Sequence, residues 1–470
     1  MLAGRLTDEE AALLATAGPE AVRLALLAAS ARIAALGRNA GNAPSASTPS
    51  GAVPPHLKPA AGRGNRRKKP GAKPGHPGSR RKPPAGVDAR EEHRLPACPC
   101  CGGELRRCDR TRTRIVEDIP SDITPVVTEH TLHRDYCPRC RKHVEPVVPD
   151  AMPNATLGHH GVALSGWFHY GLGVTVGQTR DILASHLHAA VTAGGLVDAW
   201  GRMADALRPW YERAADQLRS TACLHADETG WRVDGQTHWL WCFCDADTCL
   251  YLIDRSRGGP ALKKFFTEAF AGTLVTDFWS AYEQVCCDDR RYCLVHLLRE
   301  LEKVDERNSG PAWRAFARLL RRLVRDGIRL RKRLDFTPDK YRSRIRLINR
   351  RLNKLADDAT NGLYADPDAR RLGERVSRHR DHLFTFLDKP HVPFHNNHAE
   401  RQVRPAVVMR KNVLCNRSAG GADTQAVLMS IFRTLRLRGH DPTKAIASAL
   451  RELLQTGKLP PLPAKAAADG

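Results

Sequence analysis

The spacing of apolar residues divides the second half of the chain into helical and strand-like stretches. Residues 156–218 have the period of amphipathic helices, whereas residues 221–300 contain short runs of β-branched and aromatic residues typical of strands. Residues 297–390 return to a helical pattern rich in Arg and Lys, and residues 396–456 form a last helical stretch. The pattern therefore predicts an α/β core flanked by helices.

The strand-like runs follow one another in a defined order. We expect strands at residues 222–227, 237–245, 249–254, 273–277 and 292–296, and helices at residues 261–270 and 278–287. The first strand is expected to break at Gly230, with Gly235 completing the turn. Three strands, a helix, a strand, a helix and a strand is the order of the ribonuclease H-like fold, a mixed five-stranded sheet with helices.

The helical residues 301–390 are too many to fit within so small a sheet, and they predict an insertion. Thr337-Pro338 and Asp366-Pro367 each combine a capping residue with a first-turn proline, as helix starts do. The α/β core would then comprise residues 219–300 and 391–456.

Residues 151–218 have two interpretations. The helical run at residues 175–188, followed by Gly194-Gly195 and another helix, has the appearance of a DNA-binding helix-turn-helix. A helical bundle that supports the core is the plainer interpretation. At the far end of the chain, residues 457–470 are expected to form a loose tail.

The N-terminal part predicts little globular structure. Residues 1–37 predict two helices whose apolar stripe either self-associates or packs as a hairpin. Residues 38–87 are rich in Gly, Pro, Ala and Ser, which predicts a disordered linker. Its basic run at residues 63–84 is either a solvated charge run or a flexible arm that contacts DNA phosphates.

Composition narrows the function. A formal net charge of +23 indicates a polyanionic partner, most commonly nucleic acid. The chain has no apolar run of membrane-spanning length and no signal peptide at its start, so a cytoplasmic location is expected. In that compartment its 14 cysteines should be thiols or metal ligands rather than disulfides.

Two C-x-x-C pairs within residues 88–150 predict a small zinc-binding β domain. Cys98 and Cys101 form the first pair, and Cys137 and Cys140 form the second. Between them, residues 111–120 and 123–137 alternate like strands, and two facing knuckles would place four thiolates around structural Zn²⁺. Alternative ligands are present in the same segment: Cys100, Cys108, His93 and His143.

Three carboxylates from distant segments predict a second metal site. Asp227 lies on the first expected strand, Asp277 follows the fourth, and Glu400 begins the last helical stretch. Cleavage of phosphodiesters by two metal ions needs several carboxylates around ions about 3.5–4 Å apart. Mg²⁺ or Mn²⁺ prefers such oxygen ligands and keeps some of its waters, so three side chains suffice.

Each of these carboxylates also has a purely structural interpretation. Asp227 could cap a turn, with Glu228 as a rival ligand, and Asp277 could cap the helix that follows it. Glu400 could pair with Arg404 four residues later. The basic residues Arg401, Arg404, Arg410 and Lys411 lie on the same helix and would suit a DNA backbone approaching the acids.

The carboxylate blocks resemble those of the insertion-sequence-66 family of bacterial DDE transposases. The matching blocks are HADETGWRV, TDFWSAY and HNNHAERQVRPAVVMRKNVL. The similarity extends to GAKPGHPG, to the C-x-x-C pairs and to GGADTQAVLMSIFRTLRLRGHDP, from about residue 70 to residue 455. It implies that Asp227, Asp277 and Glu400 are the metal-binding triad, with a zinc-finger-like domain before them and a helical insertion before the glutamate.

Two details accompany this resemblance. Cys293 and His296 match a C-x-x-H pattern that follows the second aspartate in several DDE transposases, where it supports the site or the DNA; a packed strand end is the alternative. Many relatives have glycine after the second aspartate, where this chain has Phe278. Its bulk could alter the approach of a metal or fill a local pocket.

The resemblance implies a transposase that cuts double-stranded DNA at the terminal inverted repeats of its element and joins the 3′-hydroxyls to target DNA. It would act at the bacterial nucleoid as a homodimer or higher oligomer, with or without small companion proteins of the same element. Two other functions remain open: a ribonuclease H-like nuclease without strand transfer, and a DNA-binding regulator that has lost catalysis. Joining of pre-cut ends to a plasmid target separates them.

Overall fold

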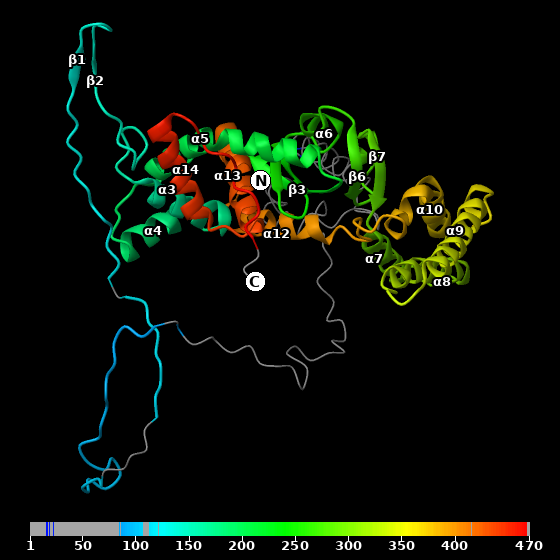
Figure 1. Cartoon of the computed structure of the whole chain (residues 1–470). Helices are drawn as coiled ribbons and strands as arrows, with labels where there is room; N and C mark the ends of the chain where they lie inside the picture. The colour runs from blue at the N-terminus through cyan, green and yellow to red at the C-terminus, as the bar shows by residue number, and fades with distance from the viewer. Residues whose placement is uncertain are drawn as a thin grey trace.

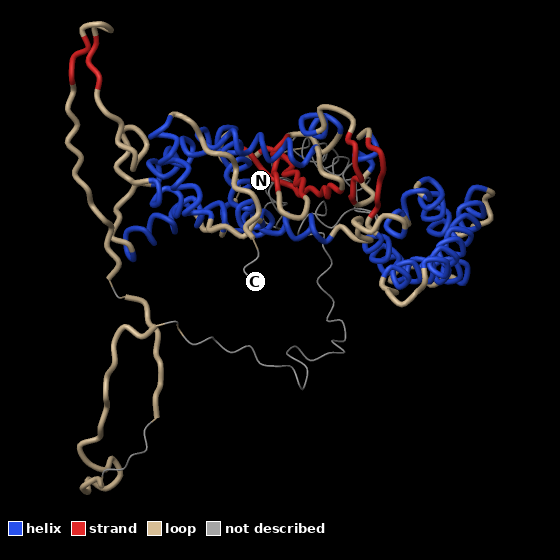
Figure 2. The backbone as a smooth tube through the Cα atoms, viewed as in Figure 1, coloured by secondary structure: helices blue, strands red, loops and turns tan. Residues whose placement is uncertain are grey.

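The computed structural model describes residues 84, 86–106, 112–120, 122–414 and 416–467, together with Thr16, Gly18 and Val22. The predictions for the N-terminal helices and for the basic linker fall almost entirely outside these residues. Figures 1 and 2 show an elongated molecule: an α/β body in the middle, a helical group that includes α8, α9 and α10 at one end, and an extended arm at the other.

A mixed five-stranded sheet forms the centre of the body. Its strands are β3 (Cys223–Val233), β4 (Gln236–Cys244), β5 (Cys249–Asp254), β6 (Phe270–Thr276) and β7 (Cys287–Tyr292), arranged in the order β5-β4-β3-β6-β7. The first three strands pair antiparallel, whereas β6 lies parallel to both β3 and β7. The mixed sheet expected from the sequence is thus present, with the first strand at its centre.

The first strand does not break at Gly230, as the sequence suggested. Strand β3 continues to Val233, and Gly230 pairs with Trp239 of β4 within the hairpin. The turn lies at Asp234 and Gly235, where both residues have positive φ angles of 49° and 69°. An Asp-Gly pair with two positive φ angles suits the two-residue turn of a hairpin.

The segment after the fourth strand also differs from the prediction. Residues 278–287 form only a short 3₁₀ helix, η3 (Ser280–Gln284), and β7 ends at Tyr292 rather than including residues 293–296. Cys293 instead precedes helix α7 (Leu294–Asp305), and its N–H donates to the carbonyl of Thr276. The earlier helix α6 (Gly259–Phe265) is present where residues 261–270 predicted one.

Helices that precede the sheet in the chain and helices that follow it pack with the sheet in one hydrophobic core. They are α3 (His159–Gly166), the π-helix η2 (Trp167–Gly171), α4 (Val176–His186), α5 (Ala193–Arg219), α12 (Asn397–Val413), α13 (Ala419–Leu437) and α14 (Pro442–Thr456). Within residues 151–218 the helices begin at His159, and their buried faces pack into this core.

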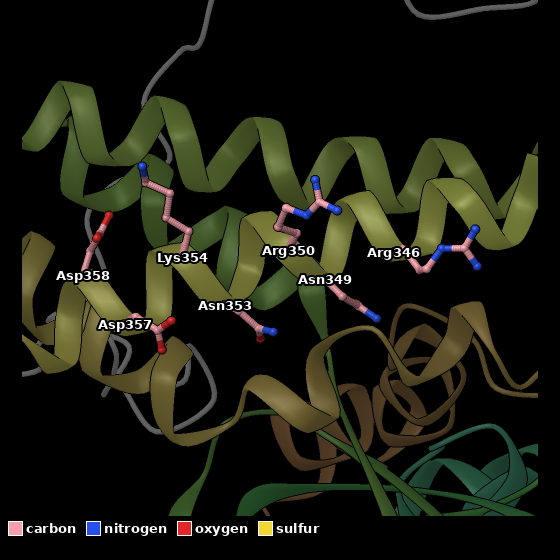
Figure 3. A pocket seen from close by; sticks show the side chains of 7 residues that line it. All are labelled: Arg346, Asn349, Arg350, Asn353, Lys354, Asp357 and Asp358. Carbon is pink, nitrogen blue, oxygen red and sulfur yellow. The ribbon is translucent and has the colours of Figure 1, made fainter.

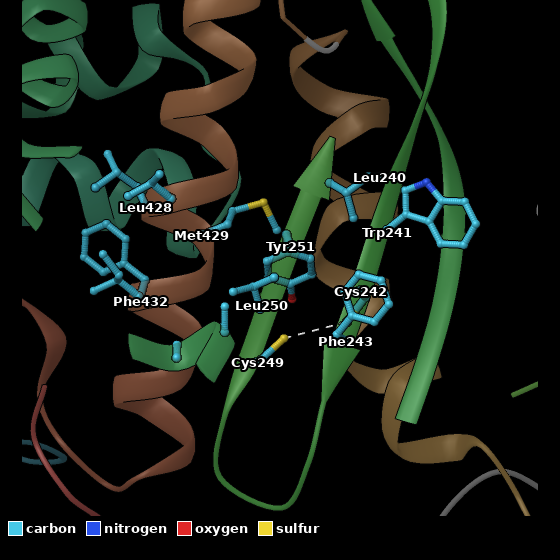
Figure 4. Close-up of a cluster of buried hydrophobic side chains, with 14 of the residues drawn as sticks. Leu240, Trp241, Cys242, Phe243, Cys249, Leu250, Tyr251, Leu428, Met429 and Phe432 are labelled. Carbon is cyan, nitrogen blue, oxygen red and sulfur yellow. Dashed lines mark hydrogen bonds between the residues drawn. The ribbon is translucent and has the colours of Figure 1, made fainter. Parts of the chain in front are cut away.

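The edge strand β5 is covered by helix α13. The Ser430 hydroxyl accepts from the Tyr251 N–H at 2.8 Å, and Thr434 bonds to both the N–H and the carbonyl of Cys249. Figure 4 shows Met429 of the same helix directed toward this strand, whereas Leu428 and Phe432 lie on the other side of the helix. These contacts satisfy backbone groups that a free sheet edge would leave open.

Four helices after α7 pack around a second hydrophobic core at the other edge of the sheet. These insertion helices are α8 (Pro311–Arg331), α9 (Pro338–Thr360), α10 (Pro367–Arg378) and α11 (Arg380–Leu383), followed by the 3₁₀ helix η4 (Thr385–Leu387). Thr337 and Asp366 cap α9 and α10 through their side chains, as their sequence predicted. The second core also contains Val275 and Tyr292, so the insertion helices are joined to the β6–β7 edge.

The arm at residues 86–150 contains little regular structure. Its strands β1 (Asp135–Cys137) and β2 (Lys142–Val144) have three residues each and form a small hairpin. The longer strands expected between the cysteine pairs are absent from the described residues. Val126 and Val127 are each more than 90% exposed. The arm therefore buries few of its own apolar side chains.

The C-terminal residues are not a loose tail as far as residue 467. The Pro460 carbonyl accepts from the Trp210 indole at 2.6 Å, and Arg438 donates to the Pro463 carbonyl at 2.6 Å. Leu462 is buried against the core. Residues 460–463 therefore contact α5 and the end of α13.

Candidate active site

The sheet brings Asp227 and Asp277 to neighbouring strands. Asp227 lies within β3 opposite Cys242 of β4, and Asp277 directly follows β6. His225 is paired with Val275 in the parallel register, so each aspartate lies two residues beyond a matched pair. The two carboxylates therefore occupy the same level of adjacent parallel strands.

Backbone N–H groups fix one oxygen of each aspartate. The Glu228 N–H donates to Asp227 Oδ1 at 3.0 Å, and the Trp279 N–H donates to Asp277 Oδ1 at 2.9 Å. Asp277 thus closes a short turn and does not cap an α-helix, because Trp279 precedes η3. The second oxygen of each carboxylate remains available for another ligand.

Glu400 lies in the first turn of α12, and Asn396 attaches that turn to the central strand. The Asn396 side chain accepts from His225 Nδ1 at 2.9 Å and donates to the Ala226 carbonyl at 2.8 Å. Its own N–H donates to Cys293 Sγ at 3.2 Å. Asn396 is 1% exposed, and sequence reasoning did not select it. The motif HNNHAE contains it, but only the folded chain reveals its bonds.

The three carboxylates influence one another electrostatically. Burial raises the pKa of Asp227 well above its usual range, and the charges of Glu228, Asp277 and Glu400 act in the same direction. Burial likewise raises the pKa of Asp277, with a further contribution from Glu400. Carboxylates held together against their repulsion are typical of a cation site.

Glu228, the rival ligand, has other partners. Its Oε1 accepts from Arg257 at 2.8 Å, and its Oε2 accepts from the Tyr282 hydroxyl at 2.7 Å. The Arg257 guanidinium lies over the rings of Trp239 and Trp279. Burial and the charge of Asp277 raise the pKa of Glu228 to about 7. With both oxygens occupied, Glu228 supports the site rather than offering a free ligand.

Cys293 and His296 lie beside Glu400. Their ligand atoms and a Glu400 oxygen lie within 4.8 Å of one another, the one such group of metal-ligand atoms among the residues described. Burial opposes ionisation of the Cys293 thiol, but contacts with His296 and with the Asn396 N–H outweigh it and lower its pKa. Burial also acts against protonated His296, yet Cys293 and Glu400 outweigh it and raise that pKa. The C-x-x-H pair therefore contacts the predicted triad.

Among the basic residues of α12, one is bonded to the sheet and the others are exposed. Arg410 donates to the Gly230 carbonyl and to the Thr229 hydroxyl, so it joins the end of α12 to β3. Arg401 and Arg404 are exposed and line a hollow of about 260 Å³ beside Leu172. The ion pairs of Glu400 are with Arg299 at 3.5 Å and His296 at 3.8 Å, not the expected one with Arg404. Lys411 is exposed on the same helix.

Phe278 fills a pocket formed with the insertion helices. Its ring stacks on Tyr292 at 4.9 Å, and the Arg375 guanidinium of α10 lies over its other side at 5.5 Å. The bulk after the second aspartate therefore packs into the second core.

The donor set suits a hard divalent ion. Asp227 and Asp277 supply buried oxygens of raised pKa, and Glu400 Oε1 is a buried atom without a hydrogen-bond partner. The Glu400 side chain is directed toward His296 and Arg299, and the three carboxylates do not form a group as tight as that with Cys293 among the described residues. A rotation of Glu400 toward β3 would complete an oxygen-rich site.

The predicted zinc ligands form two separate turns. Gly102 donates to the Cys98 carbonyl, and the Cys140 N–H donates to Cys137 Sγ at 3.4 Å. The turn with Cys98 and Cys101 and the β1–β2 hairpin lie at opposite ends of the arm in Figure 1. Within the described residues the four thiols are not gathered into one group, although two C-x-x-C turns fit zinc chemistry.

A basic surface lies on α9, away from the carboxylates. An open hollow of about 630 Å³ has a lining that includes Arg346, Arg350 and Lys354, whose side chains are drawn in Figure 3. These three residues recur every four positions and are exposed, so they share one face of the helix. The rest of the lining consists of Asn349, Asn353, Asp357 and Asp358, so the acidic residues lie at one end of the row.

Two protein-family models match this chain. A family model described as "Transposase IS66 family" matches residues 158–424, which include all three carboxylates and the insertion helices. The chain belongs to the IS66 family of transposases. A second model, the zinc-finger binding domain of transposase IS66, matches residues 96–141 of this transposase. That match supports a structural zinc ion.

Curated relatives span most of the transposase. The uncharacterized protein y4jD of Sinorhizobium fredii is 24% identical over 393 residues, covering 76% of this chain and 75% of its own. The uncharacterized protein y4hP of the same organism is 21% identical over 394 residues, covering 76% and 70%. Within the residues described, no helix is both long and apolar enough to cross a bilayer.

Proposed function

We propose that this transposase cuts DNA at the ends of its element and joins the exposed 3′-hydroxyls to target DNA, with Asp227, Asp277 and Glu400 as the metal ligands. The observation that carries the proposal is that Asp227 and Asp277 lie level on adjacent strands, while Asn396 holds the first turn of α12, which carries Glu400, against β3. The charge of Glu400 contributes to the raised pKa of both Asp227 and Asp277, which supports one shared cation site.

We further infer that the core is ribonuclease H-like. The strand order β5-β4-β3-β6-β7, with an antiparallel half and a parallel half, supports this fold. The insertion helices enter between β7 and α12, which is between the second and third carboxylates in sequence.

Two Mg²⁺ or Mn²⁺ ions at this site would supply Lewis-acid chemistry, activating the attacking oxygen and neutralising charge on the phosphate. Residues of the chain position the carboxylates that would bind these ions. Asp227 and Asp277 are held by backbone N–H groups, and Asn396 fixes the helix that carries Glu400. Arg257 and Tyr282 donate to the two oxygens of Glu228, which would leave the metal ligands to the other three carboxylates.

DNA would approach over exposed basic residues. Arg401 and Arg404 lie on the helix of Glu400, and Arg346, Arg350 and Lys354 offer a second row on the insertion helices. Such contacts bind phosphates and set the position of the duplex without reading sequence. Recognition of the terminal repeats is assigned to the zinc-binding arm and the basic linker. At least a dimer is expected to act, because two ends are handled together, and companion proteins of the element remain possible partners.

The test is cleavage and joining by purified protein on DNA carrying the element ends. Asp227→Asn, Asp277→Asn and Glu400→Gln should each abolish Mg²⁺-dependent cleavage and leave end binding intact. Pre-cut ends offered with plasmid separate a transposase, which gives joined products, from a nuclease. Cleavage that survives Glu400→Gln would exclude Glu400 as the third ligand.

A further inference from the structure

Cys293, His296 and Glu400 have the arrangement of a second metal site. His296 Nε2 and Glu400 Oε1 are 3.8 Å apart, and one ligand atom from each of the three residues lies within 4.8 Å of the others. Ligands around tetrahedral zinc lie about 3.3–3.8 Å apart, given zinc bonds of about 2.0–2.3 Å. Small side-chain rotations therefore suffice to close the three ligands on one ion.

Unsatisfied atoms give independent support for a ligand at this place. Glu400 Oε1 and His296 Nδ1 are buried atoms without a hydrogen-bond partner, although Glu400 Oε1 has looser ion pairs with Arg299 and His296, and Cys293 is fully buried. Buried polar atoms of this kind are rarely left unpaired without a functional reason. The Asn396 N–H donates to Cys293 Sγ, as outer-shell donors do to thiolate ligands.

The environment also leaves room for an ion to enter. The side chains of His296 and Glu400 are 30% and 28% exposed. Arg299, which lies 3.5 Å from the Glu400 oxygen, is 51% exposed and can turn into solvent when a cation takes its place. Three protein ligands with one open position are typical of zinc sites that retain a water.

We propose that Cys293, His296 and Glu400 bind a thiophilic divalent ion of the Zn²⁺ class, and that this ion inhibits the transposase by holding Glu400 away from Asp227 and Asp277. One sulfur, one nitrogen and one oxygen select zinc or cobalt over magnesium, because a thiolate is a poor ligand for a hard ion. The binding half of the proposal stands on the geometry alone. The inhibitory half rests on the proposed function.

Metal content of the full-length protein tests the binding half. After zinc has filled the cysteine pairs of the arm, equilibrium dialysis should show one further Zn²⁺ per wild-type chain. Co²⁺ in its place should give a near-ultraviolet thiolate charge-transfer band. In Cys293→Ser and His296→Ala the affinity should fall by roughly 100-fold or more, since even outer-shell changes cost about 10- to 100-fold.

Matched variants keep this test specific. Cys286→Ser removes an exposed thiol just before β7 and should retain the extra ion. His296→Cys replaces one zinc ligand by another and should retain it too, which a merely structural role for His296 would not predict. Equal zinc content and cobalt spectra in wild type, Cys293→Ser and His296→Ala would overturn the site.

Cleavage assays then test the inhibitory half. Zinc at the concentration that fills the extra site should lower the Mg²⁺-dependent rate of wild type, and the ratio of rates with and without zinc should approach one in His296→Ala. An unchanged wild-type rate with the site filled would overturn inhibition. Asp227→Asn separates the two claims, because it should bind the extra ion whether or not the protein cleaves DNA.

Discussion

Asn396 bonds through its side chain to His225 of the central strand, at 2.9 Å, and so holds the helix of Glu400 against the strand of Asp227. The same amide donates to the Ala226 carbonyl. Burial lowers the pKa of His225 to about 4, so the ring is neutral at neutral pH and donates from Nδ1. The relative position of two predicted metal ligands thus depends on one buried amide.

Asn396→Ala should therefore weaken both the fold and the site. It leaves the His225 ring and a backbone carbonyl without partners, at a cost of roughly 2–4 kcal/mol. Cleavage measured well below the melting temperature should fall further than stability explains, because Glu400 loses its position. Asn397→Ala, at the neighbouring and partly exposed position, is the control. Equal cleavage by both variants would contradict this role.

Asp227→Asn should raise the melting temperature at neutral pH when no Mg²⁺ is added. The wild-type carboxylate is held by burial next to other acids, and a neutral amide relieves that repulsion. Added Mg²⁺ should stabilise wild type and have little effect on the variant, since a ligand stabilises only the form that binds it. Asp288→Asn, at an exposed position on β7, should show neither effect. Calorimetry with and without the ion measures both.

Lower pH should weaken Mg²⁺ binding but stabilise the protein without added Mg²⁺. A group whose folded pKa is raised binds protons more strongly when folded, so its protonation favours the folded state as pH falls through that pKa. Asp227 and Asp277 have raised values, and that of Glu228 is about 7. As pH falls, Mg²⁺ affinity should therefore begin to decline well before the pH reaches about 4, the usual carboxyl pKa. A Mg²⁺ affinity that stays constant between roughly pH 5 and pH 8 would contradict the raised carboxyl pKa values.

Replacing Arg346, Arg350 and Lys354 by Ala should weaken binding to any DNA sequence. Loss of three phosphate contacts should reduce the salt slope of binding by about 2.7, from about 0.9 per contact. The matched control replaces Arg314, Arg318 and Arg325, which are exposed on α8, and removes the same charge. Filter binding over a salt series distinguishes the two. Identical slopes for both triple variants would show that α9 has no special role.

Cys137→Ser combined with Cys140→Ser should release the zinc of the arm and reduce binding to the element ends. The arm buries few apolar side chains, so its order depends on the metal rather than on a core of its own. The α/β body should keep its melting transition, because its cores do not include the arm. Metal analysis and proteolysis of the arm provide the measurements. Zinc retained by the double variant would exclude these ligands.

Several features could be read from the sequence because local chemistry determines them. Thr337 and Asp366 cap helices wherever those helices pack, and the first four strands form where their runs predicted them, whereas the fifth lies at Cys287–Tyr292 instead of at residues 292–296. The placement of Asp277 after a buried strand likewise needs only the hydrophobic pattern. Local signals were less reliable where packing competes with them: Gly230 continues a strand because the hairpin pairs it with Trp239.

The amino-acid sequence by itself determined the family blocks, the three candidate carboxylates and most of the strands and helices, since these depend on residue type and spacing. Only the tertiary structure decided that Glu228 is bound by Arg257 and Tyr282, and that Phe278 packs against the insertion helices. It also brought Cys293 and His296 to Glu400, about a hundred residues later in the chain. Such contacts depend on strand register and helix docking, which no local pattern encodes.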